Sequence, residues 1–109
     1  MPNISSSLYV TTAIPFVNAH PHLGFALELC QADALARHAR ARGRAVHFVT
    51  GSDDHSLKNV LAAERAGVRT ERFVAEHAAR FRQLNVELHT SIDDFVQTST
   101  HPRHRDAVY

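Results

Sequence analysis

The chain has 109 residues, of which 44% are apolar, which suits at most one globular domain. Its 12 basic and 11 acidic residues give a net charge of +1, so no strong overall field would hold nucleic acid. One cysteine excludes an internal disulfide and fits a reducing compartment, and no stretch has the length and apolarity of a membrane span or secretory signal. We therefore expect a cytoplasmic protein with no membrane partner.

A strand, a loop and a helix follow a polar lead-in over residues 1–7. Residues 8–12 are apolar and partly β-branched, which predicts a buried strand. Two prolines and an asparagine exclude regular structure over residues 13–23, and helix-favouring residues begin at Gly24. Such a loop is where α/β proteins bind anions, because free backbone N–H groups and the helix dipole point at the ligand.

The first helix is predicted to extend to about Arg42, where Gly43 ends it. Residues spaced i, i+4, i+7 and i+11 predict its buried face, on which the cysteine would be a core residue; they are Leu23, Leu27, Cys30 and Ala34. Four arginines crowd its C-terminal end, and this favours a solvated helix end that compensates the dipole over a tRNA contact; they are Arg37, Arg40, Arg42 and Arg44.

A second strand is predicted over residues 45–50, followed by a polar loop over residues 51–55. Strand, helix and strand within about 40 residues indicate a βαβ unit with parallel strands. Both polar loops then follow the carboxyl ends of strands, where open α/β sheets place their ligands. We therefore expect the two loops to meet at one edge of the sheet.

The rest of the chain is mainly helical in pattern. A short helix is predicted over residues 56–66, with Leu57, Val60, Leu61 and Glu64 along one side. A longer one is predicted over residues 70–84, with Thr70 as its N-cap. Residues 86–96 fit either a turn with a short strand or irregular structure, and Thr100 or His101 before Pro102 marks another helix start.

The segments around the two polar loops resemble one enzyme family. Pro21-His22-Leu23-Gly24 is similar to the signature of class I aminoacyl-tRNA synthetases, and the agreement is best with methionyl-tRNA synthetases. It continues in family order and spacing over Tyr9-Val10-Thr11-Thr12, Val17-Asn18-Ala19, Ala32-Asp33-x-Leu35-Ala36-Arg37, Arg42-Gly43, Phe48-Val49-Thr50-Gly51-Ser52-Asp53-Asp54-His55, Ala62-Ala63-x-x-Ala66-Gly67, Asp93-Asp94-Phe95 and Arg103-His104.

This resemblance implies an α/β fold with a Rossmann-like parallel sheet and flanking helices, of which residues 1–109 would be the first half. They would form the N-terminal portion of the catalytic domain of a methionine–tRNA ligase, whose partners are methionine, ATP with Mg²⁺, and tRNA. The family's second signature loop, zinc insertion and anticodon-binding helices do not occur in these residues. The 109 residues alone are therefore not expected to charge tRNA, and further sequence or another chain would complete the fold.

The resemblance also implies roles for single residues near the phosphates. His22 would contact the ATP phosphates, and Gly24 would lie under the adenine. Phe25 stands where the family has its second histidine, and phenylalanine cannot donate a hydrogen bond. Losing one such donor typically costs about 10²–10³ in rate, so catalysis is expected to be impaired.

The remaining implied residues would hold the amino acid. Asp53 would pair with its α-ammonium group, since a carboxylate at a strand end can hold a cation. Ile14 and Phe16 would line the methionine side-chain pocket, although the family usually has tyrosine at the position of Phe16. The plain structural alternatives are that His22 only caps a helix, that Asp53 is an N-cap or turn residue, and that Ile14 and Phe16 belong to the core.

Three functions stay open at this point. The first is the methionine–tRNA ligase. The second is a non-catalytic relative that binds a nucleotide or amino acid or assembles with a partner chain, which Phe25 favours. The third is a nucleotidyltransferase, a class that also uses a histidine-glycine-histidine helix start. A metal site is not expected, because no cysteine or carboxylate completes a tetrahedral set with His20, His22 and His55.

Overall fold

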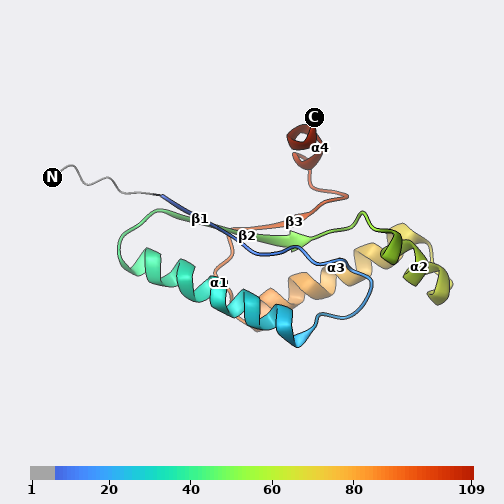
Figure 1. Cartoon of the computed structure of the whole chain (residues 1–109), viewed down its shortest axis with the longest axis horizontal. Helices are drawn as coiled ribbons and strands as arrows, with labels where there is room; N and C mark the ends of the chain where they lie inside the picture. The colour runs from blue at the N-terminus through green and yellow to red at the C-terminus, as the bar shows by residue number, and fades with distance from the viewer. Residues whose placement is uncertain (1–6) are drawn as a thin grey trace.

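The computed structural model describes residues 7–109, and the predicted polar lead-in lies, up to residue 6, outside them. Three parallel strands form one sheet in the order β1-β2-β3 within this part of the chain. The elements in chain order are β1 Leu8–Thr11, α1 Leu23–Ala41, β2 Val46–Ser52, α2 Leu57–Ala66, α3 Thr70–Glu87, β3 Asp94–Gln97 and α4 His104–Val108 (Figure 1).

The predicted parallel pairing of the first two strands is confirmed, with Leu8 opposite Val46. A third parallel strand comes from the segment whose pattern was ambiguous, so the turn with a short strand is the correct interpretation. Strand β2 extends two residues beyond the predicted end at Thr50. It does so because Gly51 pairs with Val96 of β3, so close that a Cβ on Gly51 would lie 2.0 Å from the Val96 carbonyl oxygen.

Helices α1 and α3 cover one side of the sheet, whereas α4 lies on the other (Figure 1). Beneath α1, Ala32 and Ala36 pack on Phe48 of β2. Beneath α3, a second cluster forms from Val17, Val74, Ala78 and Phe81. On the opposite face of the sheet the ring of Tyr9, which is 66% exposed, stacks on His47 with 5.7 Å between ring centroids.

The predicted buried face of α1 is wrong. Leu23 is 82% exposed and Leu27 58% exposed, and Cys30 is also exposed rather than in the core. The face against the sheet consists instead of Leu29, Ala32, Asp33, Ala36 and Ala39. Alanines let the helix approach the sheet closely, and the hydrophobic pattern misses this face because a charged residue, Asp33, lies in its middle.

The two following helices keep their predicted positions but differ in detail. Ser56 is the N-cap of α2. The predicted apolar side of this helix is wrong, because Leu57 is 72% exposed and the buried residues are Asn59 and Ala63. Thr70 is the first residue of α3 and not its N-cap, which is Arg69. The buried apolar residues of α3 are Phe73, Val74, Ala78 and Phe81, and α4 begins at His104, slightly later than predicted.

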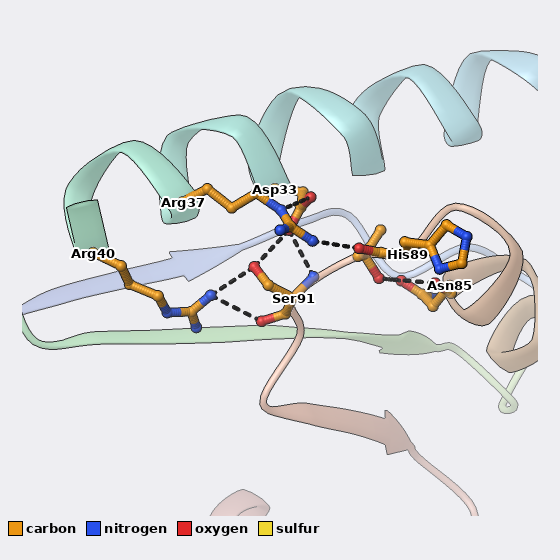
Figure 2. A network of polar contacts seen from close by, with 7 residues as sticks. Asp33, Arg37, Arg40, Asn85, His89 and Ser91 are labelled. Atoms are coloured by element: carbon orange, nitrogen blue, oxygen red, sulfur yellow. Dashed lines mark hydrogen bonds and ion pairs between the residues drawn. The ribbon is translucent and has the colours of Figure 1, made fainter.

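A polar network joins α1 to the segment before β3 (Figure 2). Both the backbone N–H and the hydroxyl of Ser91 donate to Asp33 Oδ1 at 2.6 Å, and Arg37 Nε donates to Asp33 Oδ2 at 2.7 Å. Burial raises the pKa of Asp33, but the hydrogen bonds from Ser91 and Arg37 outweigh it, so this pKa lies below its ordinary value. The carboxylate is therefore held in its charged form.

Two of the arginines at the end of α1 belong to this network. Arg37 also donates to the carbonyl oxygen of His89, and Arg40 donates to Ser91 Oγ at 2.6 Å and pairs with Asp93 at 2.7 Å. The prediction of a purely solvated helix end is therefore wrong for Arg37 and Arg40, whose guanidinium groups fix the chain that leads into β3.

Candidate functional site

The two polar loops meet at the carboxyl end of the sheet, as predicted. The backbone N–H of Asp53 donates to the carbonyl oxygen of Pro15 at 2.9 Å, and Phe16 forms an isolated parallel bridge with Asp53. Just before the loops, the hydroxyls of Thr12 and Thr50 lie 2.7 Å apart. The loop after β1 is thus joined to the loop after β2 by backbone hydrogen bonding, which places both loops on a common frame.

His22 is the N-cap of α1 and lies at the surface. Its Nδ1 accepts a hydrogen bond from the Gly24 backbone N–H at 2.9 Å, so His22 does cap the helix. In the neutral ring this places the proton on Nε2, which remains a donor toward solvent or a ligand. Capping and ligand contact are therefore compatible, because they use different nitrogens of the same ring.

The first N–H groups of α1 were expected to be free for a ligand, but they already donate hydrogen bonds within the chain. Those of Phe25 and Ala26 both donate to the carbonyl oxygen of His22, and that of Gly24 donates to the His22 ring. The helix also begins at Leu23, one residue earlier than predicted. An anion at this position would therefore depend on the His22 ring and the helix dipole more than on these three amides.

The Phe25 side chain is used in packing between α1 and α3. Its ring meets Phe81 edge-on, with 5.6 Å between centroids, and it packs against the cluster that contains Val17 and Val74. A residue at this position therefore contributes to the core, and the phenylalanine gains apolar contacts where it lacks a hydrogen-bond donor.

Ile14 and Phe16 are 41% and 40% exposed, so the alternative that they are ordinary core residues is wrong. The Phe16 ring lies beneath the ammonium group of Lys58, with 5.7 Å from Nζ to the ring centroid. Sequence reasoning missed Lys58, because no motif connects the first turn of α2 with the loop after β1. Its position adds a cation next to the bridge between Phe16 and Asp53.

Asp53 is partly exposed, and its Oδ1 accepts the backbone N–H of His55 at 3.2 Å. The N-cap of α2 is Ser56, so Asp53 is not an N-cap, and its bond to the His55 N–H is compatible with the role that the resemblance implies. The neighbouring Asp54 is only 6% exposed and faces the segment after β3. Its partners, Ser52, Thr98 and Ser99, could not be foreseen because that strand was itself ambiguous in the sequence.

The remaining histidines of the loop do not converge on a metal. His20 contacts α3 instead: Arg80 Nη1 lies 2.9 Å from its Nε2, and its ring meets that of His77 at 6.1 Å. Across residues 7–109, no three His, Cys, Asp or Glu side chains come together as ligands. A groove of about 600 Å³ follows β1 and the C-terminal half of α1 and contains none of the predicted site residues.

Comparison with known proteins identifies the family. The family described as tRNA synthetases class I (M) matches residues 8–109. The chain belongs to this class I synthetase family. Among its curated relatives, the methionine–tRNA ligase of Rhizobium meliloti (strain 1021) is 41% identical over 103 residues, and that of Mycobacterium leprae (strain TN) is 44% identical over 91 residues.

The synthetase fold is confirmed by a solved structure. The methionyl-tRNA synthetase of Mycobacterium tuberculosis, bound by methionyl-adenylate, is 40% identical, with a TM-score of 0.90 over 94% of this chain. The predicted Rossmann-like parallel sheet with flanking helices is therefore correct. The match covers 20% of that structure, and the two ligases are covered to 20% and 17%. This synthetase chain thus spans about a fifth of the length of the relatives that it matches.

One further observation concerns the synthetase chain as a whole. No helix within residues 7–109 is long and apolar enough to cross a membrane. Its longest helix, α1, has 19 residues, but charged and polar residues recur along it. The helix instead uses its small residues to pack on the sheet, and its arginines to hold the segment before β3.

Proposed function

We propose that residues 1–109 are the N-terminal portion of the catalytic domain of a methionine–tRNA ligase that acts in the cytoplasm. The observation that carries this proposal is the likeness to a structure bound by methionyl-adenylate, at 40% identity and a TM-score of 0.90. The relatives are about five times longer. Charging of tRNA is therefore proposed for the whole ligase and not for this segment by itself.

In this proposal the two joined loops bring methionine and ATP together. His22 donates from Nε2 to the phosphates, and Gly24 leaves room for the adenine because it has no side chain. Asp53 accepts the α-ammonium group of methionine, and Ile14 and Phe16 contact its apolar side chain. Activation then proceeds when the carboxylate of methionine, held beside the α-phosphate of ATP, attacks it with loss of pyrophosphate.

Mg²⁺ would enter this site with the ATP phosphates. The residues 7–109 contain no group of three candidate ligands, so they do not supply a cage of their own. Mg²⁺ commonly keeps several waters and is held by substrate phosphates with few protein ligands, which fits a site of this kind. When bound, it would offset negative charge on the phosphates.

The decisive experiment is methionine-dependent exchange of pyrophosphate into ATP by the protein as its source organism makes it. We expect exchange in the wild type and a loss of about 10²-fold in kcat/KM for methionine in Asp53→Asn, because an ammonium partner is removed. Asp106→Asn, at an exposed carboxylate on α4, is the matched control and should behave as the wild type. Equal exchange in Asp53→Asn and Asp106→Asn would contradict the role of Asp53.

A non-catalytic binding module is the second candidate, and the packed Phe25 ring favours it because it replaces a donor near the phosphates. It predicts binding of methionine or ATP without exchange. A nucleotidyltransferase would instead transfer the adenylyl group to an alkyl phosphate without methionine. The same protein assayed with an alkyl phosphate in place of methionine separates that third possibility.

A further inference from the structure

We propose that Asp54 is a positioning residue, whose buried carboxylate fixes the turn that presents Asp53 to the substrate. This inference rests on the proposed function for the identity of the substrate. Asp53 and Asp54 follow directly after β2, and they differ in surroundings: Asp53 is partly exposed beside the loop after β1, whereas Asp54 is 6% exposed.

The Asp54 carboxylate joins the end of β2 to the segment after β3. Its Oδ1 accepts the hydroxyl of Ser52 at 2.9 Å, and its Oδ2 accepts the Ser99 hydroxyl at 2.5 Å and the Ser99 N–H at 3.2 Å. The backbone N–H of Asp54 also donates to Thr98 Oγ1 at 2.9 Å. Hydrogen bonds to a charged acceptor in a buried place are stronger than neutral ones, so this junction is rigid.

A second side chain holds the same turn from the helix that follows. Asn59 is fully buried, and its Nδ2 donates to the carbonyl oxygens of both Asp53 and Asp54, at 3.2 and 3.0 Å. Its Oδ1 has no hydrogen-bond partner within the described chain. The Asn59 side chain therefore faces the turn through its donor end, and the backbone of residues 53 and 54 is held from α2 as well as from β3.

These contacts hold the backbone of Asp53, and further bonds engage its N–H and one carboxylate oxygen. Its N–H is bonded to Pro15 and its Oδ1 to the His55 N–H, so Oδ2 is the oxygen left to meet a cation from the loop side. If the Asp54 junction opens, the backbone over residues 53–55 can rotate, and the Asp53 carboxylate no longer keeps its place relative to the loop after β1. Asp54 thus acts through Asp53, without touching the substrate.

The test uses two variants of the whole protein in pyrophosphate exchange. Asp54→Asn keeps the shape of the side chain but removes its charge. Ser99→Ala removes the hydroxyl that donates to Asp54 and leaves both aspartates in place. We expect each to raise the KM for methionine, by about tenfold in Asp54→Asn, with the KM for ATP within about twofold of the wild type. Ser99→Thr retains the hydroxyl and should restore a methionine KM near that of the wild type.

A purely structural role makes a different prediction. It would raise both KM values together or lower kcat alone, in parallel with a lower unfolding temperature, and that result would overturn the proposal. An unchanged KM for methionine in Ser99→Ala and Asp54→Asn would overturn it as well. If Asp54→Asn does not fold, Ser99→Ala still tests whether the Asp54 junction positions Asp53.

A second readout separates this inference from the proposed ligase function. Hydrogen exchange of the His55 backbone amide reports the bond to Asp53 Oδ1 whether or not the protein has any activity. We expect exchange at least about tenfold faster in Asp54→Asn and Ser99→Ala, while amides in the middle of α3 stay unchanged. If the wild type shows no pyrophosphate exchange but His55 behaves in this way, only the ligase function fails. An unaltered His55 amide would refute the positioning role.

Discussion

A single contact determines how His22 presents its ring. Because Nδ1 accepts the Gly24 N–H at 2.9 Å, the opposite nitrogen faces outward, and a Cβ on Gly24 would lie 3.1 Å from Nδ1. A side chain at position 24 would therefore crowd the capping ring of His22. At the same scale, Phe25 is not merely a missing donor: its ring fills space against Phe81.

Restoring a histidine at this position should separate catalysis from stability. Phe25→His offers a donor near the phosphates, and we expect pyrophosphate exchange to rise by about 10²-fold. The same change removes apolar contacts with Phe81 and should lower the free energy of unfolding by about 1–2 kcal/mol. Phe25→Leu, which stays apolar and has no donor, is the control and should not gain activity. Pyrophosphate exchange rates and urea unfolding measure the two effects. If exchange does not rise in Phe25→His, the missing donor at position 25 does not limit catalysis.

Among the elements, strands β2 and β3 approach each other closely at Gly51. The carbonyl oxygen of Val96 occupies the place where a Cβ on Gly51 would stand, at 2.0 Å. This pairing carries the site, because β2 leads into Asp53 and β3 leads into the residues that hold Asp54. The strands can approach in this way only with glycine at position 51.

Gly51→Ala should therefore be far more damaging than a glycine substitution elsewhere. We expect it to cost about 3 kcal/mol or more, since the added methyl group must separate the two backbones. Gly67→Ala is the matched comparison: a Cβ there meets nothing within 4 Å, and only its φ of +67° opposes the change, at about 1–2 kcal/mol. Unfolding in urea ranks the two variants, and equal losses would show that the sheet tolerates the wider spacing.

The elements also show what the sequence could and could not predict. The first two strands, the helices, the meeting of the two loops and the family could be predicted from the apolar patterns, the glycines and prolines and the motifs, whereas the third strand stayed ambiguous. The buried face of α1 did not, because Asp33 is buried through partners near Ser91 that lie far along the chain. The contacts of Asp54 and Lys58 were missed for the same reason, since each is made with a segment that no local pattern connects to it.

For the molecule as a whole, the Asp33 network links α1 with the chain that enters β3, so its protonation should appear in global stability. The folded pKa of Asp33 is lowered from 3.8. The stabilisation is therefore present above about pH 3.8 and is lost as pH falls from there through the folded pKa. We expect Asp33→Asn to lower the free energy of unfolding at neutral pH and the difference from wild type to shrink in this acidic window.

Urea unfolding of both proteins between neutral pH and pH 3 measures this difference. Glu76→Gln is the control, because the ion pair of Glu76 with Arg72 is exposed and should contribute little. A gap between wild type and Asp33→Asn that is the same at both ends of the range would mean that the charge of Asp33 does not stabilise the fold.

The register of the sheet has a further consequence, for the time course of folding. Leu8 pairs with Val46 and Val49 with Asp94, so each ladder closes a loop of roughly 40 residues before its first backbone hydrogen bond can form. The helices, by contrast, are local and can form within about a microsecond. Folding should therefore pass through a state with helices in place and strand edges still open, and the sheet, with the two polar loops that it joins, should be completed last.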